Sequence, residues 1–315
     1  MPTVKTLIVV AVKRNWPLFQ LDVNNAFLHG DLDEEVFLKL PLGLSVSTTS
    51  SASTSPSLGS GDVLVLLVSY INDIIIAGTD LCEIDAVKSF LHDQFKIKDL
   101  GHLNYFLGIE VLYSEGGVLL HQKIFVHDLL KEFHSYDCSS VISPLEMHGK
   151  LQADHGDPLL NSETYRYLVG KLNFLTHTRP DICFAVQHLS QFMQKPCLPH
   201  MQAALRLLRY LKGTLDFGVF YNNSPNLSLS VYCDSAWGSC PDKAEYRSMS
   251  KAIAEITWVC RFLSDFGVVF SSPVTLFCDN QASIHIDKNP VFHERTKHIE
   301  LDCYFVRTKL NEGLL

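Results

Sequence analysis

The chain has 315 residues, of which 47% are apolar and 19% are charged. These values are typical of a globular protein with room for two or three domains, and they exclude a disordered or fibrous chain. The net charge of -8 supplies no overall basic surface, so nucleic-acid binding would depend on local basic patches and on bound cations. The nine cysteines form no CxxC pair and no secretory signal precedes them, which predicts reduced thiols in an intracellular protein. The apolar segment Thr6 to Val12 is too short to span a bilayer, so no membrane association is expected.

Leu18 to Val23 is predicted to be a strand that ends close to an acidic side chain. Its alternation places Phe19, Leu21 and Val23 on one face and Asp22 on the other. An acid at the end of a strand can hold a ligand rigidly, although such residues more often cap a helix or belong to a turn. Residues 45 to 60 then read SVSTTSSASTSPSLGS, a composition that predicts a linker or a disordered insertion.

A β-hairpin is predicted from Leu64 to Gly78, with the sequence LVLLVSYINDIIIAG. Strand-forming apolar residues flank a polar tip, Asn72-Asp73, which is good turn chemistry. The tip can therefore be a simple turn, or it can be a metal site at the end of the hairpin. The residues of the hairpin alone leave both interpretations open.

The middle of the chain has the apolar spacing of a mainly helical scaffold. A second hairpin is expected around a turn at residues 115–117, and helices are expected at 81–95, 124–133, 164–175, 181–193 and 200–211. Arg206, Arg209 and Lys212 form a basic edge on the last of these helices. This edge could contact phosphates, but cations near a helix C-terminus are also favoured by the helix dipole, so a scaffold role is the preferred interpretation.

The last part of the chain, from about residue 222, carries a set of spaced carboxylates. Asp234 and Asp279 follow predicted strands, Glu245 lies in the first turn of a helix, and Glu300 and Asp302 lie in a final helix at residues 296–310. Such acids could converge on two divalent ions; hard oxygen ligands suit Mg²⁺, and a metal pair can promote phosphodiester cleavage. The alternative is that they are helix caps and solvated strand ends.

A zinc site is not expected in this region. His293, His298 and Cys303 have a suggestive spacing, but no fourth ligand is placed to complete the coordination.

Several long segments, in order along the chain, resemble the copia-type retrotransposon Pol polyprotein. They are FQLDVNNAFLHGDLDEEVFLKLPLG, YINDIIIAG, LGHLNYFLGIEV, YRYLVGKLNFLTHTRPDICFAVQHLSQFM, LRYLKGT and CDNQASIHIDKNPVFHERTKHIELDCYFVRTKL. Their order is that of the family's reverse transcriptase followed by its RNase H. The resemblance covers nearly the whole chain except the Ser-rich stretch, and it does not include the family's protease and integrase.

The resemblance implies a polymerase site with one altered residue. Asp22 matches the first metal-binding aspartate, and Phe27 the residue beneath the incoming sugar. Tyr70, Asn72 and Asp73 match the family's Tyr-x-Asp-Asp loop, with Tyr70 beside the primer end and Asn72 at the first aspartate. A carboxamide supplies no charge to hold Mg²⁺, so two-metal catalysis is expected to be badly impaired. The Ser-rich stretch also replaces a basic, glycine-containing helix of the family, which implies an internal deletion.

The resemblance also implies an RNase H site in the last part of the chain. Asp234, Glu245 and Asp279 fall on the family's three metal-binding acids. Glu300 is favoured as the fourth acid, with Asp302 close enough on the helix to compete. The chain passes from Cys240 almost directly into the helix of Glu245, so it lacks sheet strands that the family has there.

The expected fold is therefore α+β and multidomain: a reverse transcriptase palm with an antiparallel sheet and a helical connection, then an RNase H-like α/β domain that lacks part of its sheet. The expected limits are 1–44 and 61–115 for the palm, 45–60 for the linker, 116–221 for the thumb-like helical region and 222–315 for the RNase H-like domain.

The implied cofactor is a pair of Mg²⁺ ions, and the implied partners are an RNA template, a DNA primer and an RNA–DNA hybrid. The polymerase is expected to be inactive, whereas RNase H activity is possible. The alternatives are a non-enzymatic remnant that at most binds nucleic acid, and a decayed reading frame that barely folds.

Overall fold

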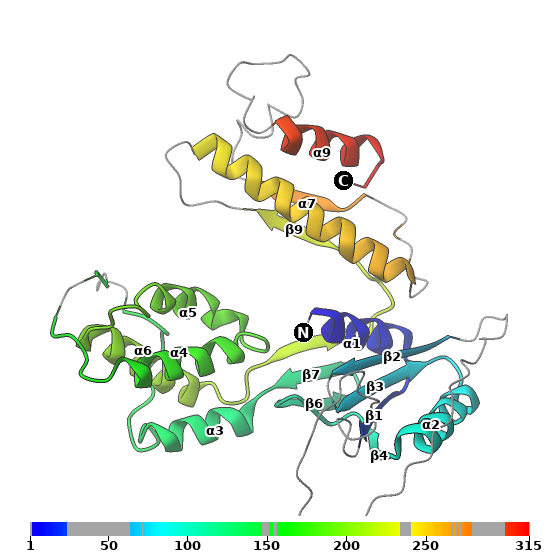
Figure 1. Ribbon diagram of the computed structural model, residues 1–315, viewed down its shortest axis with the longest axis horizontal. Helices are drawn as coiled ribbons and strands as arrows, with labels where there is room; N and C mark the ends of the chain where they lie inside the picture. The colour runs from blue at the N-terminus through cyan, green and yellow to red at the C-terminus, as the bar shows by residue number, and fades with distance from the viewer. Residues whose placement is uncertain are drawn as a thin grey trace, which may run out of the picture. The chain divides into compact units, whose positions relative to one another are not determined.

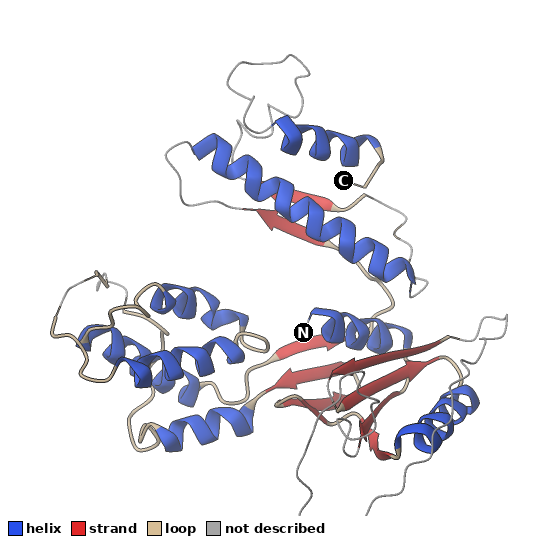
Figure 2. Ribbon diagram, viewed as in Figure 1, coloured by secondary structure: helices blue, strands red, loops and turns tan. Residues whose placement is uncertain are grey.

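The computed structural model describes residues 2–23, 64–70, 72–146, 151–153, 156–233, 241–265, 268, 270, 273–278 and 300–314. These residues form antiparallel sheets and helices, as expected for the α+β class, together with one parallel strand pair (Figures 1 and 2). The chain divides into two compact units, residues Met1–Asn223 and Ser224–Leu315, each with its own core.

The first sheet contains the predicted hairpin. Its strand order is β2-β3-β1-β4 and all its pairs are antiparallel, with bounds β1 Leu18–Val23, β2 Val65–Tyr70, β3 Asp73–Gly78 and β4 Ile97–His102. Leu21 and Val23 pack with Ile74 and Ile76 against Ile84 of helix α2, Leu81–Phe95. The strand and hairpin predictions are confirmed, and the alternation of β1 puts Asp22 on the face away from α2. The Ser-rich residues 45–60 lie outside the described residues.

Two helices accompany this sheet. Helix α2 begins at Asp80, whose carboxylate accepts a hydrogen bond from the backbone N–H of Cys82. Helix α1, Pro2–Arg14, contains the apolar N-terminal segment, and its residues Leu7, Ile8 and Ala11 are fully or almost fully buried. It contacts β3 and β8, so the apolar segment belongs to the core of the first unit. None of the helices in the described ranges is long and apolar enough to cross a membrane.

The second sheet has the order β5-β6-β7-β8, again antiparallel, with bounds β5 Tyr105–Phe106, β6 Ile109–Ser114, β7 Gly117–His121 and β8 Val219–Asn222. It contains the second predicted hairpin, β6-β7. β8 returns to this sheet after the helical region. Just before β8, a Cβ at Gly218 would lie 2.2 Å from the carbonyl oxygen of Leu120, so the approach of the returning chain to β7 requires glycine.

Between β7 and β8 the chain forms a helical bundle (Figure 1). Its elements are α3 Lys123–Glu132, α4 Ser162–Leu175, the 3₁₀ helix η2 Pro180–Ile182, α5 Cys183–Ser190 and α6 Leu198–Gly213. Leu168, Leu172, Leu189, Leu207 and Leu211 are completely buried in its core. The helix expected at 181–193 is instead a 3₁₀ turn followed by a helix that ends at Ser190. Residues 191–195 form turns and bends instead of continuing the helix.

The basic edge of α6 is engaged within the bundle. Arg206 contacts Ser143 and Glu146, with an Nη1–Oε1 distance of 3.3 Å to Glu146. Arg209 donates to the carbonyl and hydroxyl oxygens of Ser139, and Lys212 donates to the carbonyl oxygen of Cys138 at 2.8 Å. These cations fix the loop that follows α3, a set of contacts that the helix-dipole interpretation did not anticipate.

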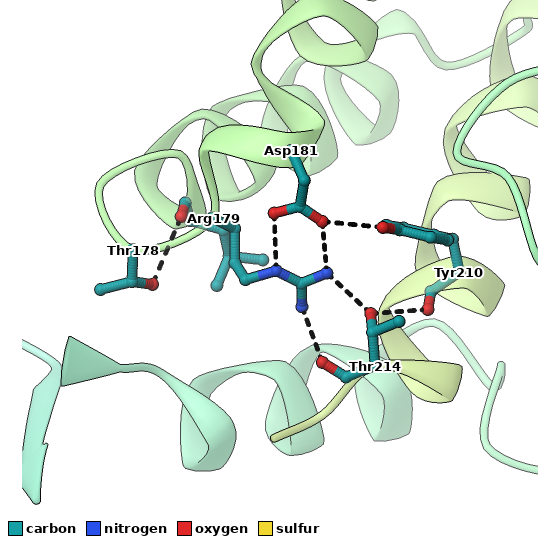
Figure 3. A network of polar contacts seen from close by, with 6 residues as sticks. Thr178, Arg179, Asp181, Tyr210 and Thr214 are labelled. Atoms are coloured by element: carbon teal, nitrogen blue, oxygen red, sulfur yellow. Dashed lines mark hydrogen bonds and ion pairs between the residues drawn. The ribbon is translucent and has the colours of Figure 1, made fainter. Parts of the chain in front are cut away.

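A buried arginine connects the end of α4 to the end of α6 (Figure 3). The Arg179 side chain is 3% exposed and binds both oxygens of Asp181, with Nε–Oδ1 2.9 Å and Nη2–Oδ2 2.7 Å. It also donates to the carbonyl and hydroxyl oxygens of Thr214, at 2.9 and 2.7 Å. The Tyr210 hydroxyl donates to Asp181 Oδ2 at 2.9 Å. The network therefore connects the segment after α4, the helix η2 and the end of α6, and it defines how these chain ends are arranged.

The second unit is smaller. Its strands β9, Ser230–Cys233, and β10, Thr275–Cys278, pair in parallel, and its helices are α7, Pro241–Asp265, and α9, Glu300–Asn311. Cys233, Met249, Ile253 and Val306 form its buried core. Because β9, α7, β10 and α9 all contribute to this core or pack against it, the described part of the unit is held by one hydrophobic centre.

Replacing Arg179 by methionine is expected to destabilise the bundle by about 1.5–3 kcal/mol, because Asp181 and Thr214 lose a charged donor while water can still solvate the Asp181 carboxylate. Arg166→Met is the matched control, since Arg166 is an exposed arginine of α4 that donates to the backbone carbonyls of Met193 and Gln194. The control is expected to lose about 1 kcal/mol. Hydrogen exchange of peptides from α4 and α6 measures both values, and equal losses in the two variants would contradict this role of Arg179.

The contribution of Asp181 is expected to disappear in acid. Burial alone would raise the pKa of this carboxyl, but the hydrogen bonds from Arg179 and Tyr210 and the charge of Arg179 outweigh it, so its pKa lies below the usual value. Its stabilising contribution is thus fully present above the unfolded-state pKa of about 3.9, and it is lost as the pH falls through the lower folded-state pKa. Urea unfolding gives the free energy of unfolding of the unmodified chain and of Asp181→Asn, and the difference between the two should decrease below about pH 4. A gap that stays constant down to pH 2 would show that the carboxylate charge contributes nothing.

Candidate active site

Four polar side chains form one row across the first sheet. Tyr70 of β2 pairs with Asp73 of β3, Asp73 pairs with Asp22 of β1, and Asp22 pairs with Lys98 of β4. Directly paired residues of neighbouring strands present their side chains on the same face of a sheet. The structure therefore brings three of the sequence-predicted residues, Tyr70, Asp73 and Asp22, onto the face away from α2.

Asp22 and Asp73 are the acidic centre of this row. Both are half-buried and they face one another on neighbouring strands. Like charges in directly opposed positions of a sheet are destabilising. The buried side chain of Gln20 lies on the same face, two residues before Asp22, and its Nε2 donates to Asp73 Oδ1 at 3.2 Å. One oxygen of Asp73 is thus already oriented by β1.

Asn72 lies at the tip of the hairpin, immediately before Asp73. Its carbonyl oxygen accepts a hydrogen bond of 2.8 Å from the backbone N–H of Val23, which ties the tip to the end of β1. The Oδ1 atom of its side chain is buried and has no hydrogen-bond partner among the described residues. A buried acceptor without a donor is costly and is compatible with a missing cation or water.

These atoms fit the ligand chemistry of a hard cation, with one charge fewer than a two-metal site needs. Asp22 and Asp73 offer two carboxylates from rigid neighbouring strands, and Asn72 offers a neutral oxygen. In the described ranges, no three acidic, histidine or cysteine side chains are grouped closely enough to form a metal site. Asp22, Asp73 and Asn72 are the described residues of this site that could hold such a cation.

Two residues of this face were not singled out from the sequence. Gln20 could have been found from its spacing, because residues two apart on a strand share a face, so Gln20 accompanies Asp22. Lys98 could not, since only the pairing of β4 with β1 brings it opposite Asp22. Phe27 lies outside the described residues, so its predicted role beneath the sugar stays a prediction.

The predicted acids of the second unit are only partly described. β9 and β10 end side by side at Cys233 and Cys278, which are paired, and Asp234 and Asp279 follow in the sequence but lie outside the described residues. The side chains of Glu245 in α7 and Glu300 in α9 also lie outside them. His293, His298 and the side chain of Cys303 are likewise not described.

Asp302 is the one among the predicted acids of the second unit whose side-chain contacts are described. Its Oδ1 accepts a hydrogen bond of 2.9 Å from the Ser250 hydroxyl, and its Oδ2 lies 3.9 Å from Arg247 Nε. Both partners belong to α7, so Asp302 joins α9 to the helix that carries Glu245. The choice between Glu300 and Asp302 as the fourth acid stays a prediction.

Comparison with protein families gives a match to the reverse transcriptase (RNA-dependent DNA polymerase) family over residues 1–55 and 55–147. The chain is 32% identical, over 99% of its own length, to the retrovirus-related Pol polyprotein from transposon RE1 of Arabidopsis thaliana. It is 26% identical over its whole length to the corresponding polyprotein from transposon TNT 1-94 of Nicotiana tabacum. An uncharacterized mitochondrial protein of Arabidopsis thaliana is 29% identical over 61% of the chain and 93% of its own length.

The chain spans about a quarter of the length of the Pol polyproteins it matches, 26% for transposon RE1 and 30% for transposon TNT 1-94. No solved structure matches the chain.

Proposed function

Since this chain contains the reverse transcriptase region of a copia-type retrotransposon Pol polyprotein, we propose that its polymerase site has lost the ability to extend a primer, whereas its second unit is a reduced RNase H. The ancestral activity of the first unit is RNA-directed DNA synthesis on an RNA template with a DNA primer. Its site is the row formed by Tyr70, Asp73 and Asp22, and Phe27 belongs to the same site by resemblance.

The uncharged side chain of Asn72 carries the proposal. Mg²⁺ bound at such a site would neutralise phosphate charge and stabilise the leaving oxygen. The residues of this chain supply two carboxylates, Asp22 and Asp73, and a neutral amide where the family has a third acid. Two divalent cations close together repel one another strongly, and negatively charged ligands offset that repulsion. Losing one of three carboxylates therefore weakens the binding of both cations.

Two features of the comparisons support an internal deletion as a second cause. The family match is in two pieces that meet at residue 55, inside the Ser-rich stretch 45–60. The alignment with the transposon RE1 polyprotein extends over 382 positions, more than the 315 residues of this chain, so the relative has positions that this chain lacks. A missing helix between Asp22 and the hairpin would remove part of the nucleotide and template pocket even if Asn72 were repaired.

A face of α4 is the proposed surface for the primer–template. Tyr167 is 46% exposed there, and Lys171 Nζ lies 5.1 Å from its ring and 5.3 Å from that of Phe125. Gly170 lies between them in the helix interior, and no described atom comes within 4 Å of where its Cβ would be. Glycine in a helix interior costs about 1 kcal/mol relative to alanine, and none of the described residues packs against this position to offset that cost. An open glycine beside an aromatic ring and a cation suits the close approach of a nucleic-acid backbone.

The second unit supports an RNase H that keeps only part of its fold. Its parallel strands β9 and β10 end in register just before Asp234 and Asp279 in the sequence, and α7 carries Glu245 near its start. Acids that follow adjacent parallel strands meet at one edge of a sheet, which is the arrangement that two Mg²⁺ ions require. The competing proposal is a non-enzymatic remnant that at most binds nucleic acid. A chain that binds nucleic acid in a salt-dependent way but does not cleave an RNA–DNA hybrid would favour the remnant.

Asn72→Asp is expected to raise the affinity for Mn²⁺ about tenfold or more, since a third carboxylate restores charge to the site. Neither this variant nor the unmodified chain is expected to extend a primer, because the pocket stays incomplete. Asn72→Ala is the control and should bind Mn²⁺ no better than the unmodified chain. Binding is followed by the loss of the free Mn²⁺ signal in electron paramagnetic resonance, and extension on a primed RNA template with Mg²⁺. Template-dependent primer extension by the unmodified chain would contradict the proposed loss of polymerase activity.

For the second unit, Mg²⁺-dependent cleavage of the RNA strand of an RNA–DNA hybrid is expected, with a loss of at least about a hundredfold in Asp279→Asn, because an uncharged ligand no longer supports a two-metal site. Glu255→Gln, at an exposed position of α7, removes one charge elsewhere and should cleave normally. If a chain with folded α7 and α9 does not cleave, or if Asp279→Asn cleaves as well as the control, the RNase H proposal fails and the remnant is favoured.

A further inference from the structure

We propose that Gln20 is a positioning residue that holds the Asp73 carboxylate in place for cation binding; this inference rests on the proposed descent of the site from a polymerase. Gln20 is 5% exposed and lies two residues before Asp22 on β1. Its Nε2 donates to Asp73 Oδ1 at 3.2 Å. A single strand thus supplies one acid of the pair and the donor that orients the other.

The hydrogen bond from Gln20 restrains the Asp73 carboxylate, which is repelled by Asp22. Asp73 and Asp22 are directly opposed in the β1–β3 ladder, and repulsion between the two charges favours rotamers that separate them. A donor from the strand of Asp22 directs Asp73 Oδ1 toward β1, and no hydrogen bond to Oδ2 is formed among the described residues. Donors that bind the ligands of a metal fix ligand orientation in this way and affect affinity strongly.

Asp22 and Asp73 each have a different polar neighbour from another strand position. Gln20 contacts Asp73, whereas Lys98 is the cross-strand partner of Asp22 on β4. Lys98 is exposed, so water screens its charge, while Gln20 is buried and its donor is directed at a fixed atom. The geometry therefore assigns the orienting role to Gln20 rather than to the lysine.

A purely structural role makes a different prediction from a positioning role. If Gln20 merely fills space and satisfies its own buried amide, an apolar residue of similar length should alter stability without altering cation affinity. If Gln20 orients Asp73, the affinity for a cation should fall even when the fold is intact. Outer donors of this kind typically change metal affinity by about 10–100-fold.

The experiment measures Mn²⁺ binding to the full chain by electron paramagnetic resonance, with and without Gln20→Met, in a background that carries Asn72→Asp together with Asp279→Asn to remove the proposed metal site of the second unit. Leu18→Met in the same background is the matched control, because Leu18 is a buried residue of the same strand and face that lies four residues from Asp22. We expect Gln20→Met to weaken Mn²⁺ binding about tenfold or more and Leu18→Met to leave it unchanged. Gln20→Leu is measured in parallel, and it decides the question if Gln20→Met does not fold, as judged by circular dichroism.

Unchanged affinity in a folded Gln20→Met or Gln20→Leu chain would overturn the positioning role and leave the proposed function intact. An equal loss in Leu18→Met would also overturn it, since any change in the buried face of β1 would then have the same effect. Failure of the Asn72→Asp chain itself to bind Mn²⁺ would overturn the role of Gln20, whereas the proposed loss of primer extension is tested separately by the extension assay.

Discussion

The antiparallel pairing of β1 with β3 is the constraint on which the first unit depends. It sets Asp22 directly opposite Asp73, and it also aligns the apolar residues that pack against α2. Sheet register allows no partial adjustment, because a shift of one residue would move every side chain to the other face. The two acids are therefore held together by the burial of Leu21 and Ile76, although like charges in this arrangement repel one another.

This coupling explains how chemistry can be lost while the fold persists. The core of the first sheet is apolar and does not include the side chain of Asn72. Replacing an acid by an amide at the hairpin tip removes charge from the site, yet the strands still pair up to Tyr70 and Asp73. Such a sheet can persist when a charge at the hairpin tip is lost, because packing and ligand binding depend on different atoms.

The helical bundle is stabilised by different means. Its helices are packed by leucines, but the junction between α4 and α6 depends on Arg179 and its bonds to Asp181 and Thr214. A buried ion pair adds little net stability compared with apolar residues, whereas breaking it is costly. Its effect here is to define one arrangement of the helix ends, close to the point where the chain returns to β8.

The sequence by itself determined the α+β class, the hairpin, β1 and most of the helices of the bundle, since these follow from local periodicity. It also carries the resemblance to the copia-type family, and that resemblance predicts the roles of Asp22, Asn72 and Asp73. It did not reveal β4, β8 or the helical nature of the N-terminal segment, whose short apolar stretches are ambiguous until they have partners.

Only the tertiary structure decided which groups accompany the acids. Gln20 has an unremarkable place in the sequence until the β1–β3 register brings its amide to Asp73, and Lys98 reaches Asp22 only because β4 pairs with β1. Likewise, only the packing of α6 against the loop after α3 shows that Arg209 and Lys212 donate hydrogen bonds to that loop. Periodicity specifies which face a side chain takes within its own strand or helix, but strand order and helix packing decide what lies across from it.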